Sequence, residues 1–344
     1  VYYDMKNALQ PVLVSAELWG RHFYAGERLP TKICVINDKE DGSLLPASQL
    51  HWQLVNNNGQ TFAKGEKDVA ALENYGREWI DPNILIPKDL PQQRVEGKLV
   101  LQLTANGKVI AENSYDLLFA EKNSLNTERL KDKKIVVVDL NKTISPALDF
   151  LGVKYTAAGS VADAVNQKAD VFVFSGLDSV NTPGVEAEKI KALIQHGGNV
   201  LLTQSGNYAH FLYPQYVRSV VNVPGEIANM DIPESAIFNG IEPLDIRYFN
   251  NNQREKPTVV TDAFRINRDP SVEALASFTK IHGYLSGQVS ARMSTLDKIK
   301  GFPIVKIKDS QGNAILSAIL FEKAVTDPVP AKLLINMLND LAGK

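Results

Sequence analysis

The sequence predicts two domains of different class, an antiparallel β-sandwich followed by a doubly wound, mostly parallel α/β domain. A length of 344 residues is typical of two domains when each takes roughly 150 residues. The hydrophobic pattern changes from short strands before residue 122 to alternating strands and helices after residue 135. Between them, NSLNTERLKDKK (123–134) is polar and charged, as is typical of a linker.

Residues 11–122 carry short strand patterns separated by turn signals, with no segment of helical period and length. Asn58-Gly59 and Asn106-Gly107 are hairpin signals, because a type I′ turn needs positive φ at both central residues. This pattern predicts a sandwich of immunoglobulin type that lacks the cysteine pair of antibody domains, since Cys34 is the only cysteine. The predicted strands are 12–19, 29–37, 50–56, 61–67, 76–80, 98–105 and 108–118.

Residues 135–344 begin with alternating strand and helix patterns. KIVVVDL (134–140) is a continuous apolar run, which is typical of a parallel strand covered on both faces. A helix at 185–196 has Thr182-Pro183 before it and Gly197-Gly198 after it. The alternation predicts a doubly wound sheet of flavodoxin type. The other predicted elements are helices at 144–151, 161–167 and 330–341, strands at 154–156, 170–175 and 199–203, and a hairpin of 303–309 with 314–321.

Composition and motifs exclude several classes of function. A net charge of −2 gives no electrostatic footprint for nucleic acid or an anionic membrane surface. No apolar run approaches the about 20 residues of a membrane-spanning helix. A single cysteine rules out internal disulfides and thiolate metal clusters, and the scattered histidines have no zinc spacing. No G-x-G-x-x-G follows the first α/β strand, so we expect no cofactor and no metal.

The first ten residues, VYYDMKNALQ (1–10), predict a short amphipathic helix. Tyr2, Met5 and Leu9 share one face, and Gln10-Pro11 ends the helix because proline lacks the amide donor. Nothing within these ten residues covers the apolar face. We therefore expect the segment to pack against another domain.

Several stretches are similar to family 2 glycoside hydrolases. YYDMKNALQPVLVS (2–15) resembles the junction where the last helix of the (β/α)8 catalytic barrel enters a following β-sandwich. The later stretches IKALIQHGGNVLLTQ (190–204), AIFNGIEPLDIRYF (236–249) and DPVPAKLLINMLNDL (327–341) resemble the class I glutamine-amidotransferase-like domain appended to some of these enzymes.

This resemblance implies that residues 1–10 are the end of a barrel helix, 11–122 an immunoglobulin-like sandwich, 123–134 a linker and 135–344 an amidotransferase-like domain. It implies a parent protein that hydrolyses β-linked glycosides, as β-galactosidases and β-mannosidases do. The expected partner is the N-terminal catalytic barrel of the same polypeptide, and a homo-oligomer and a carbohydrate are further candidates. A periplasmic or secreted protein is implied, although the composition is equally compatible with the cytosol.

The catalytic motifs of the resembling enzymes have no match in this sequence, so we expect no catalytic residue. An active amidotransferase holds a nucleophilic Cys in a G-x-C-x-G turn with a later His–acid pair. Here the turn reads LTQSG (202–206), with Gln204 at the Cys position, and no H-x-E follows because His282 is the only histidine after His210. Ser205 lacks the first glycine of a G-x-S-x-G elbow, so a polar loop is the favoured interpretation over a cryptic amidohydrolase.

Glycosidase chemistry of this family uses two glutamates on barrel strands, one as acid/base and one as nucleophile. The glutamates of residues 11–122 lie in or beside predicted sandwich strands and turns, with nothing to pair them. We interpret them as solvated carboxylates. They are Glu17, Glu27, Glu73, Glu78 and Glu112.

A binding rim is predicted at the carboxyl ends of the parallel strands, where ligands bind in doubly wound sheets. Aromatic residues also cluster after the strand at 199–203, which is equally typical of a covering loop or an oligomer interface. The rim residues are Asp139, Ser175, Gly176, Gln204, Ser205, Asn207 and Tyr208. The aromatic cluster is Tyr208, Phe211, Tyr213 and Tyr216.

The sequence thus favours a non-catalytic pair of accessory domains that supports a glycosidase barrel or its oligomerisation. The alternative is a pair of carbohydrate-binding modules with its own glycan site. Trp19, Trp52 and Trp79 would then be stacking platforms, but their positions in alternating strands favour core packing.

Overall fold

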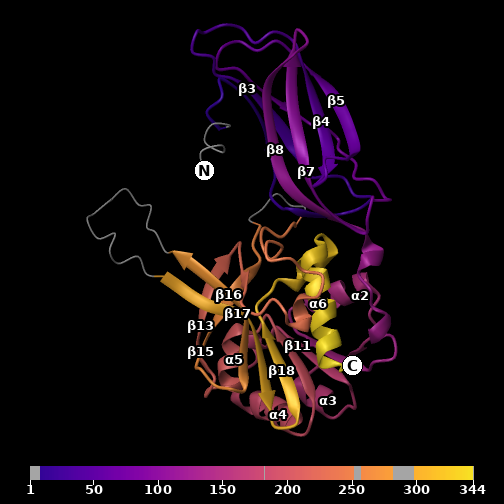
Figure 1. The fold of residues 1–344 in the computed structure, drawn as a ribbon. Helices are drawn as coiled ribbons and strands as arrows, with labels where there is room; N and C mark the ends of the chain where they lie inside the picture. Colours follow the sequence, from indigo (N-terminus) through magenta and orange to yellow (C-terminus); the bar gives the residue numbers. More distant parts are fainter. Residues whose placement is uncertain (1–7, 182, 252–256, 282–297, 344) are drawn as a thin grey trace, which may run out of the picture. The chain divides into compact units, whose positions relative to one another are not determined.

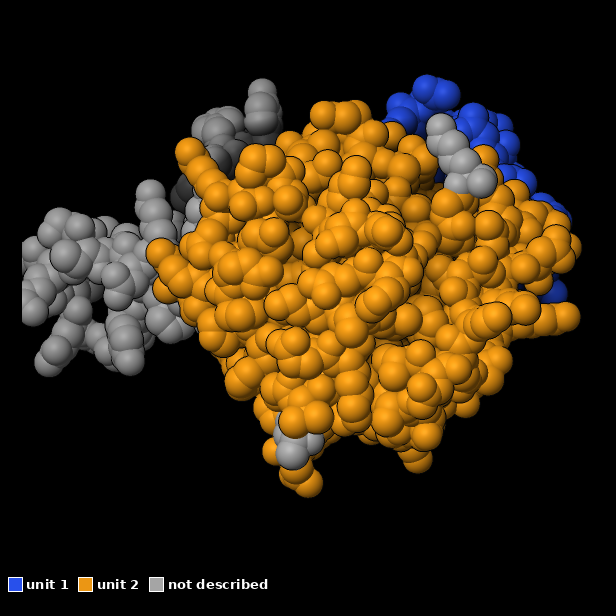
Figure 2. All heavy atoms as spheres, turned by 90° about the horizontal axis from the view of Figure 1, so that it is seen from below, with its two compact units in different colours: residues 1–124, 250–255 blue, residues 125–249, 256–344 orange. Residues whose placement is uncertain are grey.

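The computed structural model describes residues 8–181, 183–251, 257–281 and 298–343 (Figure 1). The chain divides into unit 1, residues 1–124 with 250–255, and unit 2, residues 125–249 with 256–344 (Figure 2). The division falls within the segment predicted as a linker, and residues 250–255 group with unit 1 although the strand and helix pattern assigns them to the second domain. Most of the predicted N-terminal helix lies outside the described residues. Among the described residues, none of the helices combines the length and the apolar composition that spanning a bilayer requires.

Unit 1 is a β-sandwich, as predicted. Its strands are β1 (Val12–Glu17), β2 (His22–Tyr24), β3 (Lys32–Asn37), β4 (Ser48–Asn56), β5 (Thr61–Val69), β6 (Arg77–Ile80), β7 (Arg94–Ala105) and β8 (Lys108–Ala120). One sheet has the order β1-β3-β6 and the other β2-β8-β7-β4-β5, and among these described strands only β2 and β8 pair in parallel. The predicted turn at Asn106-Gly107 is confirmed, since φ is 51° and 72° at its two residues.

Period-two alternation builds the core of unit 1. Leu99, Leu101 and Leu103 on β7 are fully buried, while the residues between them are partly exposed. They share one cluster with Val14 and Val35 of the other sheet, so the two inner faces enclose a common apolar layer.

Unit 2 contains a sheet of mixed direction covered by helices (Figure 1). Its strands are β9 (Ile135–Asp139), β10 (Thr156–Ala157), β11 (Val171–Ser175), β12 (Asn199–Thr203), β13 (Val217–Gly225), β14 (Asn229–Met230), β15 (Val260–Ile266), β16 (Val272–Ile281), β17 (Lys298–Asp309) and β18 (Gly312–Ser317). Its helices are α2 (Ile144–Leu151), α3 (Val161–Val165), α4 (Pro183–Gln195), α5 (Gly206–Leu212) and α6 (Pro328–Leu341), with short 3-10 turns η2 (Glu128–Leu130), η3 (Leu177–Ser179), η4 (Ala236–Phe238) and η6 (Phe321–Val325).

The parallel part of this sheet has the order β10-β9-β11-β12-β18, which is the flavodoxin-like order of a doubly wound fold. Beyond β18 the sheet continues through antiparallel β17 and β15 to β13. The predicted hairpin of β17 with β18 is confirmed, whereas β13, β14, β15 and β16 were not predicted. Helices α3, α4 and α5 pack on one face of the parallel part, and α2, α6 and η6 pack on the other.

The start of β18 is packed against the end of α4 with no space for a side chain. A Cβ placed on Gly312 would lie 2.3 Å from the carbonyl oxygens of Gly198 and Ile194. Backbone atoms cannot move aside as a flexible side chain can, so the close approach requires glycine at this position.

We expect Gly312→Ala to lower the free energy of unfolding of unit 2 by about 1–3 kcal/mol, because the extra methyl group displaces the backbone of α4. Urea denaturation followed by circular dichroism measures the change. Gly184→Ala is the matched control, since nothing lies within 4 Å of a Cβ there and the residue is in helix α4. Equal stabilities of the two variants would show that β18 and α4 are not in tight contact.

Candidate binding rim at the carboxyl edge of the parallel sheet

Register places the ends of four parallel strands in one row. Asp139 pairs with Ser175, Ser175 with Thr203, and Thr203 with Ser317. The predicted rim residues Asp139 and Ser175 therefore lie on adjacent strands at the same edge. Gly176, Gln204 and Ser205 directly follow this row.

Asp139 caps helix α2. Its carboxylate accepts hydrogen bonds from the backbone amides of Thr143 (3.1 Å), Ile144 (3.1 Å) and Ser145 (2.8 Å). These amides have no partner inside the helix, and a carboxylate at this end also interacts favourably with the helix dipole. The side chain is thus engaged in holding β9 to α2.

Asn141, which the sequence interpretation did not include, connects three of the strands. Its Oδ1 accepts hydrogen bonds from the Ser175 hydroxyl (3.0 Å) and the Thr143 hydroxyl (2.8 Å). Its Nδ2 donates to Oε1 of Gln204 (2.9 Å). Gly176 takes φ 73° beside it, where a Cβ would lie 2.7 Å from the Asn141 side chain. The only sequence signal for Asn141 is its position two residues after a parallel strand.

Gln204 occupies a strained turn between β12 and α5. Its φ is 47°, in the left-handed region that non-glycine residues seldom enter. Its amide nitrogen donates to the carboxylate of Glu322 on η6. Burial raises the pKa of the Glu322 carboxyl, while hydrogen bonds, including that from Gln204, and the nearby Lys323 ammonium oppose the rise. Glu322 is distant in sequence, so only the folded chain brings it to this rim.

Ser205 and Asn207 have structural roles at the start of α5. The buried Ser205 hydroxyl donates to the Thr203 carbonyl (2.9 Å) and accepts from the Leu177 amide (2.9 Å). The backbone amides of Asn207 and Tyr208 donate to the Asp178 carboxylate at 3.2 and 2.8 Å. Of the two rim side chains Ser205 and Asn207, only Asn207 is exposed.

Tyr208 does not line the rim, which corrects its predicted place there. Its side chain is 1% exposed and lies in the core cluster with Tyr213, which is also fully buried. Tyr208 lies in α5 and Tyr213 directly follows it, and both share the core cluster with strand residues such as Phe174 and Leu202. Burial is the main cause that raises the pKa of both phenols. Phe211 is the member of the aromatic cluster with a large exposed surface.

Two carboxylates approach each other beside the rim. A Cβ on Gly206 would lie 2.9 Å from Asp262 on β15, and Asp178 caps the same helix. Burial raises the pKa of Asp262, the Thr261 hydroxyl lowers it, and the nearby Asp178 raises it. Among the described residues, no group of His, Cys, Asp and Glu is arranged to hold a metal ion. The rim is therefore an edge of amides, hydroxyls and carboxylates that are hydrogen-bonded mainly to one another.

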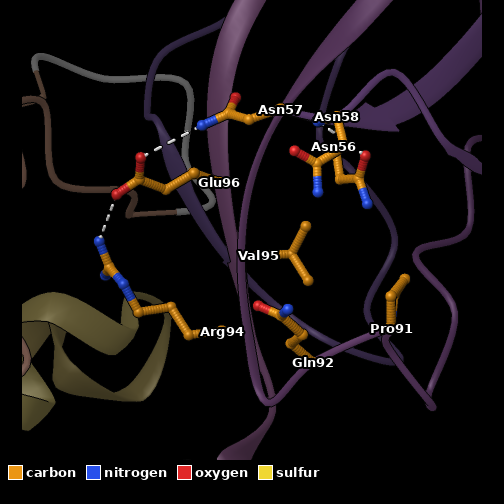
Figure 3. A pocket seen from close by; sticks show the side chains of 8 residues that line it. All are labelled: Asn56, Asn57, Asn58, Pro91, Gln92, Arg94, Val95 and Glu96. Carbon is orange, nitrogen blue, oxygen red and sulfur yellow. Dashed lines mark hydrogen bonds and ion pairs between the residues drawn. The ribbon is translucent and has the colours of Figure 1, made fainter.

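Unit 1 has a separate polar pocket of about 380 Å³ beside the β4–β5 turn (Figure 3). Three consecutive asparagines, Asn56 to Asn58, face the segment 91–96 across it. Glu96 accepts from Arg94 (2.8 Å) and more weakly from Asn57 (3.5 Å). Such a pocket offers amide hydrogen bonds and no aromatic surface for stacking.

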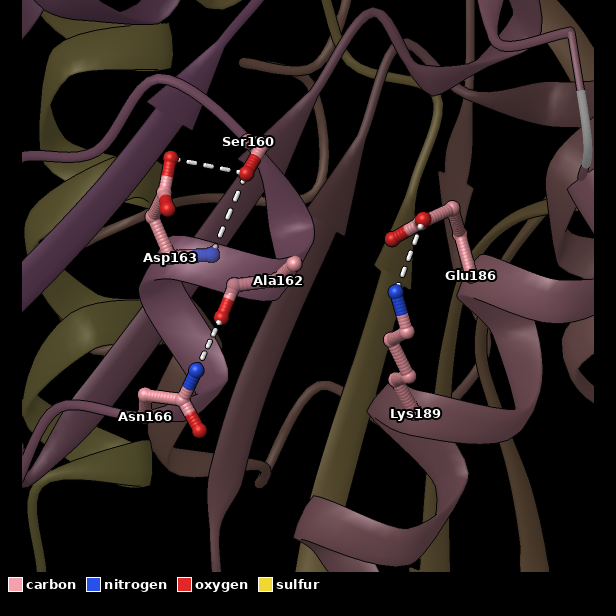
Figure 4. A network of polar contacts seen from close by, with 6 residues as sticks. All are labelled: Ser160, Ala162, Asp163, Asn166, Glu186 and Lys189. Atoms are coloured by element: carbon pink, nitrogen blue, oxygen red, sulfur yellow. Dashed lines mark hydrogen bonds and ion pairs between the residues drawn. The ribbon is translucent and has the colours of Figure 1, made fainter.

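The polar contacts of α3 and α4 are local to their helices (Figure 4). Ser160 caps α3 by accepting from the Asp163 amide (3.1 Å), and its hydroxyl donates to the Asp163 carboxylate (2.8 Å). Lys189 pairs with Glu186 one turn earlier on α4 (3.1 Å). These contacts stabilise helix ends and surfaces and form no candidate site.

No known protein family matches the chain, and no curated protein matches its sequence. Similar solved structures include a β-galactosidase from Bacillus circulans sp. alkalophilus, with 10% identity, TM-score 0.36 and coverage of 60% of this chain and 30% of that one. A β-galactosidase from Rahnella sp. R3 has 13% identity and a TM-score of 0.35, and the match covers 56% of this chain and 30% of that one. The exo-chitosanase CsxA from Amycolatopsis orientalis has 18% identity and a TM-score of 0.25, and the match covers 33% of this chain and 12% of that one.

This chain thus spans between 12% and 30% of the length of these three proteins.

We expect Glu322→Gln to be more stable than the parent chain near neutral pH and to lose that advantage in acid. Burial raises the carboxyl pKa above its ordinary 4.5, so the folded state holds the proton more tightly than the unfolded chain. The stability of the parent chain therefore falls as pH rises through the raised pKa. Glutamine keeps an acceptor for the Gln204 amide without a charge.

Urea denaturation at about pH 7 and about pH 4 measures this difference. The exposed Glu234→Gln variant is the control and should show no pH-dependent gain. A gain for Glu322→Gln that is the same at both pH values would mean that the carboxylate charge is not the cause.

Proposed function

We propose that this chain forms non-catalytic C-terminal accessory domains of a family 2 glycoside hydrolase that acts on β-linked glycosides. Unit 1 is the sandwich that follows the catalytic barrel, and unit 2 is an amidotransferase-like domain without its chemistry. The two units support the barrel or its oligomerisation. The barrel of the same polypeptide is the proposed partner, and the proposed location is periplasmic or secreted.

The turn at Gln204 carries this proposal. An amidotransferase nucleophile needs a thiol on a strained strand-to-helix turn. The strained turn is present here, with φ of 47° between β12 and α5, but it carries a carboxamide. The carboxamide is not a nucleophile, and its two ends are hydrogen-bonded to Asn141 and Glu322. This combination supports a fold that kept the backbone of a reactive site and lost the reactive group.

The purified chain should fold and show no hydrolysis of nitrophenyl β-glycosides, because the two glutamates of glycosidase chemistry would belong to the barrel. Circular dichroism confirms folding in the same sample. Turnover above that of a heat-denatured sample would refute the proposal. The reading frame before Val1 is a second test, since a frame that encodes no barrel with paired glutamates contradicts it.

A glycan-binding role for unit 1 is the second candidate, and the exposure of two tryptophans favours it. Trp79 on edge strand β6 is 52% exposed and Trp19 is 39% exposed, so neither packs in the core as the sequence indicated, whereas Trp52 is buried as predicted. Trp79 pairs with Cys34 on β3, and Cys34 pairs with Ser15 on β1, so these residues share one face of the sheet.

That face also carries hydrogen-bonding groups beside the aromatic rings. Glu17 and Lys32 lie opposite each other on it, and Trp19 donates its indole N–H to Glu17 (3.0 Å). An exposed indole face next to charged and polar groups is suited to stacking on a sugar ring while its hydroxyls are hydrogen-bonded.

If this face binds glycans, β-linked gluco-, manno- or galacto-oligosaccharides should change the tryptophan fluorescence saturably. Trp79→Ala should then weaken binding by roughly tenfold, because a stacked ring and its buried area are lost. Tyr75→Ala, which removes another exposed aromatic ring of unit 1, is the control and should bind as the parent chain does. Unchanged fluorescence across the panel would remove this candidate.

A further inference from the structure

Helix α6 carries a polar stripe on an otherwise apolar surface. Lys332, Asn336 and Asn339 follow one another at intervals of four and three residues, so they lie on one side of the helix axis. The other side of α6 is buried in the core of unit 2 through Leu333, Leu334, Met337 and Leu338. Packing of α6 against the core explains its apolar side but not this row of two amides and one cation.

The stripe forms one wall of a pocket of about 370 Å³ within unit 2. Arg129 of η2 and Asn239, which follows η4, line it from the other elements. The volume lies within the usual range of small-molecule sites, about 300–1,000 Å³. Asn336 holds α6 to the segment around η4, because its side-chain amide donates to the backbone carbonyls of Ile237 and Asn239 at 2.9 Å each.

The pocket is lined by two cations, Arg129 and Lys332, that the described part of the chain does not neutralise. Neither Arg129 nor Lys332 forms an ion pair with a carboxylate of the described residues. The third charged group of the lining, Asp340, is already paired with Lys306 at 2.7 Å. Burial lowers the pKa of Lys332, which is the effect expected when an ammonium loses water without gaining a counter-ion.

One of the lining residues also has an unmet acceptor. Oδ1 of Asn339 is buried and has no hydrogen-bond partner within the described part of the chain. A buried polar atom without a partner destabilises a protein by about 1–3 kcal/mol, so such atoms are rare. An O–H donor from a ligand would satisfy it once the Asn339 side chain turns toward the pocket, and an anionic group would neutralise the two cations.

We propose that this pocket binds a small polyhydroxy anion, a sugar acid or a sugar phosphate. The anionic group lies between Arg129 and Lys332, where the planar guanidinium gives two parallel hydrogen bonds to a carboxylate or phosphate. A hydroxyl of the same ligand donates to Asn339. The lining residues other than Ala236 and Gly343 are polar and none is aromatic, which selects a hydrophilic compound. The site is independent of the glycosidase relationship proposed above.

Isothermal titration calorimetry of the full chain tests this assignment with D-glucuronate, glucose 6-phosphate, glucose and inorganic phosphate. We expect saturable binding of at least one of the two sugar anions, and binding at least tenfold weaker for glucose and for inorganic phosphate. Glucuronate and glucose 6-phosphate then identify which anionic group is preferred. Equal binding of glucose would overturn the role of the cations, and equal binding of inorganic phosphate would overturn the role of the hydroxyls.

Two variants locate the site. Lys332→Met keeps the apolar stem and should weaken sugar-anion binding at least tenfold, while Asn339→Leu removes the acceptor and should weaken it severalfold without lowering the melting temperature. Lys168→Met, which removes an exposed lysine elsewhere on unit 2, is the charge-matched control. No saturable binding by the parent chain up to about 10 mM ligand, or binding that Lys332→Met leaves unchanged, would overturn the proposal.

Discussion

A parallel sheet places all of its strand ends at one edge, and the organisation of unit 2 depends on this constraint. Asp139, Ser175, Thr203 and Ser317 form one row because their strands are in register. Helices start at the same edge, and their first amides need acceptors. Asp139 supplies them for α2 and Asp178 for α5. Most polar groups of the predicted rim are therefore engaged in joining strands to helices, and few remain available to a ligand.

Local sequence patterns predicted most of the sandwich and the parallel half of the sheet, since alternation and continuous apolar runs are properties of neighbouring residues. Local patterns do not show which strands pair when the strands are far apart in the sequence. The antiparallel extension depends on contacts such as Phe264 with Phe302, and residues 250–255 group with unit 1. Alternation also shows which residues share a face of a strand but not whether that face is covered. For this reason Trp52 was placed correctly and Trp79 was not.

The same limit applies to the candidate sites. The rim could be predicted because the ends of parallel strands are visible in the sequence, but Glu322 reaches Gln204 from more than a hundred residues away. The strained backbone at Gln204 is a property of the folded turn and leaves no trace in composition. On α6, the apolar residues indicated a buried helix, and they do cover the core. The amides of Asn336 and Asn339 line a pocket only because the fold brings Arg129 to its other side, which the helical pattern cannot indicate.

The open edge of the larger sandwich sheet has a consequence for the behaviour of unit 1 in concentrated solution. Strand β5 ends this sheet, so its outer backbone groups are unpaired within the sheet and could accept a strand from another molecule. Lys64, Glu66, Lys67 and Asp68 all lie on it. Pairing a second strand with β5 would restrict these charged side chains and remove part of their hydration, which disfavours intermolecular sheet extension and the aggregation that follows from it.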